Sequence, residues 1–249
     1  MLRKTSAGIL ASLTWWCMSL AGHAATVTHI YELNGSFADA LGGPSMVPTG
    51  GTLGLTGYTF GAGQGPHVSQ AINPATYSIE MLFSIDTTSD YRKLIDFKDR
   101  TVDTGLYNLN TALNFYDLTT GPTGTFTAGQ MAHLVVTRDD TTDAFIGYVN
   151  GVQQIAFTDA GALATFTGAN NIIHFLRDDS AVGGENASGF LDLVRLYDGV
   201  LTSAEVTDLF NGGVPPGLPG PSAVPEPATV FLVSLGLLGV GVVARRRQP

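Results

Sequence analysis

The chain has 249 residues, of which 44% are hydrophobic, only 13% are charged and 31 are glycine, and its formal net charge is −9 at pH 7. This acidic balance argues against a nucleic-acid-binding protein, because such a protein needs basic side chains opposite the phosphates. The single cysteine, Cys17, lies in an N-terminal apolar stretch, so removal of that stretch would exclude disulfides, thiol nucleophiles and zinc–thiolate sites from the mature protein.

The N-terminal segment has the order of features found in secretory signals. Arg3 and Lys4 precede an apolar stretch over about 7–20, and small residues follow it. A basic region, a short apolar region and a small-residue cleavage site define a signal peptide. We therefore predict a signal peptide over 1–24, with cleavage after Ala24 or, alternatively, one residue later. The other interpretation is a retained membrane helix, for which the stretch is short.

Alternation of apolar and polar residues predicts a β protein between the two ends of the chain. The clearest strand is 77–86, where Glu80 lies on the polar face and Leu82 is the only apolar residue on that face. Asn150-Gly151 is typical of a two-residue hairpin turn, since both residues accept positive φ. Further strands are predicted at 26–33, 92–97, 105–108, 112–117, 132–138, 144–149, 152–157, 172–176 and 189–197.

The last of these strands carries one acidic residue at a position that alternation assigns to the apolar face. Asp192 is expected to share that face with Phe190, Val194 and Leu196. A buried carboxylate needs a hydrogen-bond partner, so we interpret Asp192 as a structural residue with such a partner.

One helix is predicted, directly after the last strand. Thr202 and Glu205 have the spacing of a capping box, and Gly212-Gly213 ends the helix. Its apolar face consists of Val206, Leu209 and Phe210. Many short strands with one terminal helix predict an all-β, two-sheet antiparallel sandwich over 25–213. The Pro- and Gly-rich stretch 214–223 is predicted to be a linker.

The C-terminal segment 224–249 combines a short motif, an apolar stretch and a basic cluster. The motif consists of Pro225, Glu226 and Pro227, and the cluster consists of Arg245, Arg246 and Arg247. At 1.5 Å per residue the apolar stretch 228–244 reaches about 26 Å as a helix, near the minimum for a bilayer core. Arginines at that end favour a cytoplasmic C-terminus.

This tripartite tail resembles the PEP-CTERM sorting signal. The resemblance implies membrane attachment through the C-terminal helix, recognition and removal of the tail by an exosortase-type transpeptidase, and delivery to the cell envelope, cell surface or extracellular polysaccharide matrix. An ordinary tail anchor is the alternative, and both interpretations place the protein outside the cell.

Three stretches of the central region resemble the LamG-like (concanavalin A-like lectin/glucanase) jelly roll. They are the opening strand and acidic loop 31–39, the hairpin 132–138 with 147–152, and the closing strand 189–197 with its capped helix. The resemblance implies two antiparallel sheets with loops at the rim. The functions it implies range over sugar binding, protein adhesion and passive structure.

Calcium is the cofactor that the acidic loops suggest, because calcium takes six to eight oxygen ligands that loops commonly supply. LamG-like domains often hold calcium at the rim, which implies candidate ligands in the opening and late loops. The candidates are Asp39, Asp178, Asp179 and Glu185. The alternative is that these acids cap turns and keep the loops soluble. The acids of 139–143 are interpreted as a solvated hairpin turn.

No catalytic residues are predicted, because neither Glu80 nor Asp192 has a second acid beside it on its strand, as a retaining glycosidase would need. His133 and His174 are interpreted as hydrogen-bonded packing residues. We expect a non-catalytic binding or scaffold module whose partners are polysaccharide or surface proteins. The alternatives are an adhesion module without a glycan ligand and, less favoured, a glycoside hydrolase. Aromatic candidates for a sugar platform are Tyr91, Tyr107 and Tyr116, and the ligand itself stays unknown.

Overall fold

The computed structural model describes residues 25–167 and 170–218. The predicted signal peptide, the sorting motif with its apolar stretch, and the arginine cluster lie outside the described residues, as does the second half of the predicted linker. Within the described ranges, no helix is both long and apolar enough to cross a membrane.

The described part of the chain contains fourteen strands and one short helix. The bounds are β1 Thr26–Tyr31, β2 Thr52–Leu53, β3 Tyr58–Phe60, β4 His67–Val68, β5 Tyr77–Ile85, β6 Tyr91–Asp96, β7 Gly105–Leu109, β8 Ala112–Tyr116, β9 Thr119–Thr120, β10 Ala132–Asp139, β11 Ala144–Val149, β12 Val152–Thr158, β13 Ile173–Phe175, β14 Gly189–Asp198 and α1 Ser203–Phe210.

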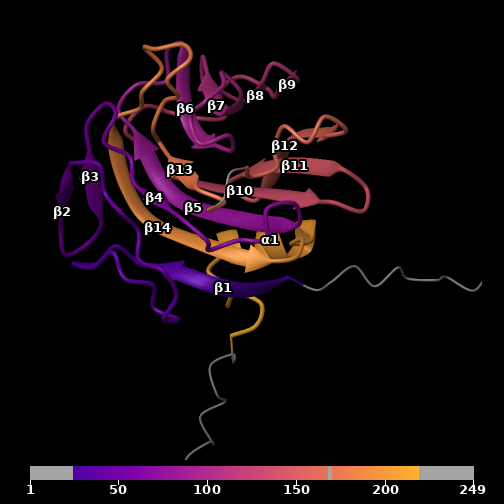
Figure 1. Ribbon diagram of the computed structural model, residues 1–249, viewed down its shortest axis with the longest axis horizontal. Helices are drawn as coiled ribbons and strands as arrows, with labels where there is room; N and C mark the ends of the chain where they lie inside the picture. Colours follow the sequence, from indigo (N-terminus) through magenta and orange to yellow (C-terminus); the bar gives the residue numbers. More distant parts are fainter. Residues whose placement is uncertain (1–24, 168–169, 219–249) are drawn as a thin grey trace, which may run out of the picture. The chain divides into compact units, whose positions relative to one another are not determined.

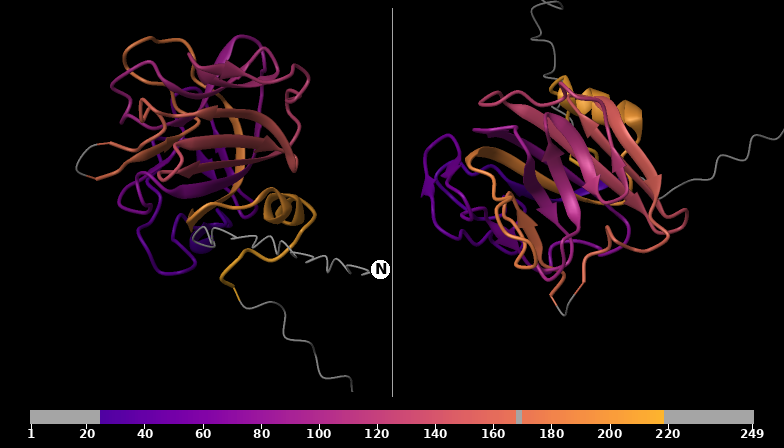
Figure 2. Two further views of the ribbon diagram at one scale, coloured as in Figure 1. Left: turned by 90° about the vertical axis from the view of Figure 1, so that its right-hand side faces the viewer. Right: turned by 90° about the horizontal axis from the view of Figure 1, so that it is seen from above.

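These strands form two antiparallel sheets, which confirms the predicted sandwich (Figure 1). The large sheet has the order β12-β11-β10-β5-β14-β3-β2, with β1 also paired to β14. The small sheet has the order β4-β13-β6-β7-β8-β9. The large sheet is strongly curved, and its concave side faces the small sheet. The views in Figure 2 show the same two layers from the side and from above.

The long central pair β5 and β14 organises the large sheet. The register pairs Tyr77 with Asp198 and Ile85 with Gly189, so the two strands run together over their whole lengths. On its other edge, β14 pairs first with β3 and then with β1. Alternate residues of β5 enter the core between the sheets, where Ile79, Met81 and Phe83 are fully buried.

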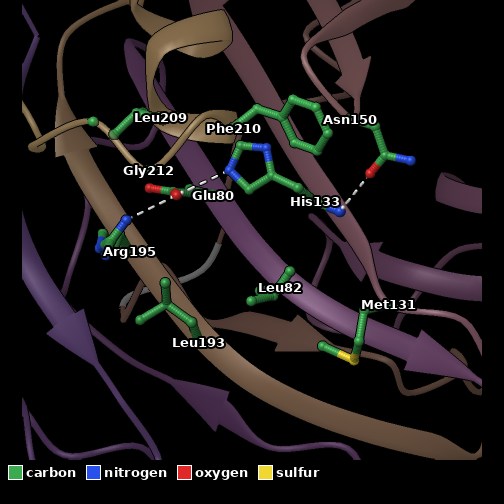
Figure 3. A pocket seen from close by; sticks show the side chains of 11 residues that line it. Glu80, Leu82, Met131, His133, Asn150, Leu193, Arg195, Leu209, Phe210 and Gly212 are labelled. Carbon is green, nitrogen blue, oxygen red and sulfur yellow. Dashed lines mark hydrogen bonds and ion pairs between the residues drawn. The ribbon is translucent and has the colours of Figure 1, made fainter.

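The outer face of β5 is also buried, although alternation predicts a strand exposed on one side. Ser78 and Glu80 are almost inaccessible to solvent. The Ser78 hydroxyl donates to Gly199 O and accepts from the Leu201 N–H, so the chain that follows β14 is tied down across the large sheet. That chain leads into α1, and Leu82, the apolar residue on the polar face, lines the pocket between α1 and the large sheet (Figure 3).

The capping box and the hairpin turn are both confirmed. Thr202 accepts from the Glu205 N–H, and the Glu205 carboxylate accepts from the Thr202 N–H. Asn150 and Gly151 have φ values of 52° and 76°. One part of the helix prediction is wrong: Val206 and Leu209 are buried, but Phe210 is 46% exposed.

The prediction for Asp192 is also wrong, because β14 carries a bulge between Leu191 and Leu193. The bulge shifts the alternation by one residue. Leu191 and Val194 therefore enter the core, whereas Asp192 is half-buried at the irregularity. Burial raises the pKa of its carboxyl group.

Candidate functional site

Three tyrosines gather on the outer face of the small sheet. Tyr91 begins β6, Tyr107 lies in β7 and Tyr116 ends β8. Each alternates with core residues such as Leu106 and Phe115, so the tyrosine rings lie on the side away from the core. The ring centroids are 5.5 Å apart for Tyr91 and Tyr107, 5.7 Å for Tyr91 and Tyr116, and 6.3 Å for Tyr107 and Tyr116, all edge to face. Tyr107 is fully buried, and the other two rings are half-buried.

Three carboxylates from two loops surround the Tyr107 hydroxyl. Asp103, Asp179 and Glu185 each place an oxygen within 4.8 Å of the others. The Tyr107 hydroxyl lies 3.1 Å from Asp103 Oδ1 and 3.3 Å from Asp179 Oδ2. We call these three acids with the three tyrosines the tyrosine–carboxylate cluster.

A buried lysine neutralises part of this cluster. Lys93 on β6 is fully buried, and its Nζ lies 2.9 Å from Asp179 Oδ2 and 3.5 Å from Asp96 Oδ2. The same ammonium donates to Thr104 O at 2.9 Å and lies 4.3 Å from the centroid of the Tyr107 ring. A buried ammonium is stable only with such partners, so Lys93 anchors the loops that bring the acids together.

The acids of this region have different protonation tendencies. Burial raises the pKa of Glu185, and the neighbouring charges of Asp103 and Asp178 raise it further. Burial also acts on Asp179, but its hydrogen bonds with backbone N–H groups and with Lys93 outweigh it, so the pKa of Asp179 is lowered. Burial of the ring raises the pKa of Tyr107 far above its ordinary value, so its hydroxyl stays protonated.

The sequence-predicted calcium ligands are brought together only in part. Asp179 and Glu185 belong to the cluster, and Asp103 joins them. Asp178 lies beside it, but its two oxygens accept the N–H groups of Asp179 and Glu185. The sequence does not show which acids the loops bring together through their hydrogen bonds. Asp103 was therefore not among the predicted calcium ligands.

Asp39 is engaged elsewhere in the fold. Its oxygens accept from the Ile30 N–H at 2.8 Å and the Gly43 N–H at 2.7 Å, and one lies 2.7 Å from His29 Nδ1. Although burial alone raises its pKa, these hydrogen bonds lower it overall. Asp39 therefore closes the loop that follows β1.

The cluster offers oxygen ligands to a hard cation, but the ammonium of Lys93 would compete with that cation for one of them. Three carboxylate oxygens converge, and Glu185 Oε2 is buried without a hydrogen-bond partner among the described residues. Calcium, however, takes six to eight oxygens, and the ammonium of Lys93 already lies on Asp179. The three carboxylates alone are therefore fewer than calcium takes, and any further ligands would have to come from other oxygen atoms.

Both histidines predicted as packing residues are hydrogen-bonded. His133 Nε2 lies 2.9 Å from Glu80 Oε1, and His174 Nε2 lies 2.9 Å from Asp99 Oδ1. In the hairpin 139–143, Asp140 and Asp143 have exposed carboxylates, but both also lie near the buried guanidinium of Arg138. That hairpin is therefore tied to the fold by an ion pair as well as solvated.

Comparison with known families matches two parts of the chain. The family model described as "Concanavalin A-like lectin/glucanases superfamily" matches residues 60–207, more than half of the chain. The model described as "PEP-CTERM protein-sorting motif" matches residues 223–247. No curated protein matches the chain.

Several solved structures share the fold at low sequence identity. Domain 4 of AbnA, a GH43 extracellular arabinanase from Geobacillus stearothermophilus solved with arabinotriose, is 21% identical with a TM-score of 0.57, covering 75% of this chain and 98% of that one. Trypanosoma rangeli sialidase is 18% identical with a TM-score of 0.57, covering 74% and 32%. The binding domain of botulinum neurotoxin serotype D is 10% identical with a TM-score of 0.53, covering 75% and 52%. At these identities the likeness establishes the fold alone.

Proposed function

From the premise that this chain belongs to the concanavalin A-like lectin/glucanases superfamily and carries a PEP-CTERM protein-sorting motif, we propose that it is a non-catalytic carbohydrate-binding module. The sorting motif indicates an exported protein of the cell envelope or surface, anchored in the membrane and processed by an exosortase. The proposed ligand is a polysaccharide of the envelope or extracellular matrix, the polymer that such a protein meets there.

The observation that carries this proposal is the tyrosine–carboxylate cluster. Sugar rings have apolar C–H faces that pack against aromatic rings, and hydroxyl groups that donate hydrogen bonds to carboxylates. Tyr91 and Tyr116 keep part of each ring accessible, and the half-buried acids Asp103 and Glu185 lie on the same face of the small sheet. Tyr107 is buried beneath them and holds the acids in place.

The test is binding of the exported protein to the host's own extracellular polysaccharide and to a glycan array. Replacing Tyr91 or Tyr116 by alanine should weaken binding about fivefold each, since one aromatic contact contributes about 1 kcal/mol beyond buried area. Leu55→Ala is the matched control, because Leu55 is 86% exposed in the loop between β2 and β3. Equal binding by all three variants would contradict this site.

A protein-adhesion module without a glycan ligand is the alternative outcome of the same experiment. Failure of the wild-type protein to bind any glycan, together with concentration-dependent self-association, would favour it. The exposed apolar residues outside the cluster, such as Val152 on the edge strand β12, would then be the first to replace.

One observation favours a second candidate function, glycoside hydrolysis. The structure brings together carboxylates that alternation along single strands does not pair, with the pKa of Glu185 raised and that of Asp179 lowered. Such a difference is the pattern of a general acid and its partner carboxylate. Asp179, however, is only 5% exposed and is paired with the ammonium of Lys93. These contacts favour a role in holding the loop in place over a role in catalysis. Release of reducing sugar from β-glucan or arabinan, abolished by Glu185→Gln, would establish hydrolysis instead.

We further propose that calcium binds weakly at Asp103, Asp179 and Glu185. The converging oxygens and the partnerless Glu185 Oε2 support this. When bound, the ion would offset the excess negative charge of the cluster and hold the loop containing Asp179 and Glu185 against β7.

A further inference from the structure

Two histidines that are far apart in the sequence lie side by side on the outer face of the small sheet. His67 lies in β4 and His174 in β13, and the register places them directly opposite each other. Their neighbours Val68, Ile173 and Phe175 enter the core, so by alternation both imidazoles lie on the side away from it. The ring centroids are 5.3 Å apart. Strand pairing thus brings two metal-ligating side chains together.

The backbone hydrogen bonds make this a close cross-strand pair. The Phe175 N–H donates to Pro66 O at 3.0 Å, and hydrogen-bonded and non-hydrogen-bonded pairs alternate along an antiparallel ladder. The N–H and C=O of His67 are bonded instead to the backbone of Val47, on the other side of β4. His67 and His174 therefore form a non-hydrogen-bonded pair, in which the side chains of opposite strands approach most closely.

Each ring keeps one nitrogen without a partner. His67 Nδ1 and His174 Nδ1 are both buried, and neither makes a hydrogen bond among the described residues. His174 Nε2 lies 2.9 Å from Asp99 Oδ1. Because a carboxylate only accepts, this Nε2 carries the proton, and Nδ1 of the neutral ring is left with a free lone pair. A buried acceptor without a partner costs stability, and a metal ion that accepts lone pairs would remove that cost at both rings.

The protonation of the pair suits metal binding, which requires neutral imidazoles. Burial lowers the pKa of His67, and the neighbouring His174 and Arg177 lower it further. Burial also lowers the pKa of His174 and outweighs the hydrogen bond with Asp99, which raises it. The charged side chains that act on the two rings are two carboxylates and two guanidiniums, namely Asp96, Asp99, Arg100 and Arg177. Their charges balance, so they do not exclude a cation.

The spacing of the rings fits a single tetrahedral ion. Zinc binds imidazole nitrogen at about 2.0–2.1 Å, so two imidazoles on one tetrahedral zinc place their ring centroids about 5 Å apart. The 5.3 Å between His67 and His174 agrees with this value. A ligating histidine commonly donates its second N–H to a carboxylate, which fixes the orientation of its ring, and Asp99 occupies that position beside His174.

We propose that His67 and His174 bind a zinc ion through their Nδ1 atoms, with Asp99 as the residue that positions His174. Imidazole suits zinc, whereas calcium and magnesium take oxygen ligands. Among the described residues, no third histidine, cysteine or acid completes a group with this pair, so water fills the other positions on the ion. The ion enters from the side of His67, which is half-buried, because His174 is only 6% exposed.

The zinc would tie β4, the last strand at its end of the small sheet, to β13. This site uses none of the residues of the tyrosine–carboxylate cluster. The inference is therefore independent of the proposed carbohydrate binding, and either can fail without the other.

The experiment is isothermal titration calorimetry of zinc into the exported protein after treatment with EDTA, with calcium and magnesium as the oxygen-preferring probes. His67→Gln and His174→Gln each remove one ligand, and Asp99→Asn keeps an acceptor but removes its charge. His29→Gln and His133→Gln are the matched controls, because His29 is half-buried like His67 and His133 is 6% exposed like His174. Zinc-edge X-ray absorption on the wild-type protein identifies the ligand atoms independently of how any variant folds.

We expect zinc to bind the wild type and both control variants with equal affinity. Asp99→Asn should weaken binding about tenfold, and each ligand variant should weaken it more than that. The absorption spectrum should show two imidazole nitrogens at about 2.0–2.1 Å from the zinc. Absence of zinc binding to the wild type, or zinc held by carboxylate oxygens alone, would overturn the inference. Equal affinity of the wild type and both ligand variants, or an equal loss in the controls, would overturn it as well.

Discussion

Removal of the buried ammonium of Lys93 is the sharpest perturbation of the tyrosine–carboxylate cluster. In Lys93→Met the apolar stem is kept, but Asp179 and Asp96 lose a partner whose side chain is fully buried beside theirs. Breaking a buried ion pair by removing one member costs about 3–5 kcal/mol, because the remaining charge is left uncompensated. For a domain of this size, that loss lowers the melting temperature by about 6–20 °C.

The loss should depend on pH in a defined direction. The pKa of Asp179 is lowered in the folded protein, where hydrogen bonds from backbone N–H groups and from Lys93 outweigh burial. A lowered carboxyl pKa contributes stability that is present above the unfolded pKa, about 3.9, and is lost as the pH falls through the folded value. The difference between wild type and Lys93→Met should therefore be largest at neutral pH and shrink on acidification below about pH 4.

Urea unfolding at neutral and acidic pH measures this difference. Lys98→Met is the matched control, because among the described residues the ammonium of Lys98 donates to the carbonyls of Ala162 and Thr165, and the side chain is partly exposed. It should cost about 1 kcal/mol and show little dependence on pH. Equal stability of Lys93→Met and wild type, or a difference that grows on acidification, would refute the role assigned to Lys93.

Three further predictions concern the cation, the ion pair under α1 and processing. Calcium at a hundredfold excess over its dissociation constant should stabilise the domain by about 2.7 kcal/mol, and Glu185→Gln should remove most of that stabilisation. Identical melting curves in calcium and in EDTA would contradict the proposed calcium site. Glu80→Gln removes the charge opposite Arg195 and should lower the free energy of unfolding in urea by about 1–3 kcal/mol at neutral pH. This loss should diminish on acidification, because the pKa of Glu80 is lowered in the folded protein. A loss that does not vary with pH would argue against that ion pair. Mass spectrometry of the exported protein should show an N-terminus at Ala25 or Thr26 and no residues beyond the 224–227 region; retained C-terminal arginines would contradict tail removal.

The long strands could be predicted because each carries its own alternation and ends at a turn. Strand β11 matches its predicted bounds, and β5, β10 and β14 match theirs within one residue. The short strands β2, β3, β4 and β9 were missed, because two or three residues are too few to show a period. They form through backbone pairing with longer neighbours rather than through a pattern of their own.

Burial on the outer face of the large sheet could not be predicted from alternation alone. The pattern of β5 distinguishes one face from the other but does not say that α1 covers the second face. The bulge in β14 is a similar case. Its extra residue shifts every later side chain to the other face, and nothing in the local composition around Asp192 reveals it.

The sequence by itself determined the fold class, the sorting motif and the residue types available for binding, because those depend on local periodicity and short motifs. Only the tertiary structure decided which side chains meet. Asp103, Asp179 and Glu185 converge across up to about eighty residues of chain because β6, β7 and the loop before β14 pack together around Lys93. Asp39, which resembles them in sequence, is instead held by the N–H groups of its own loop. Carboxylates act through distances of a few ångströms, and those distances arise from strand pairing that no local pattern encodes.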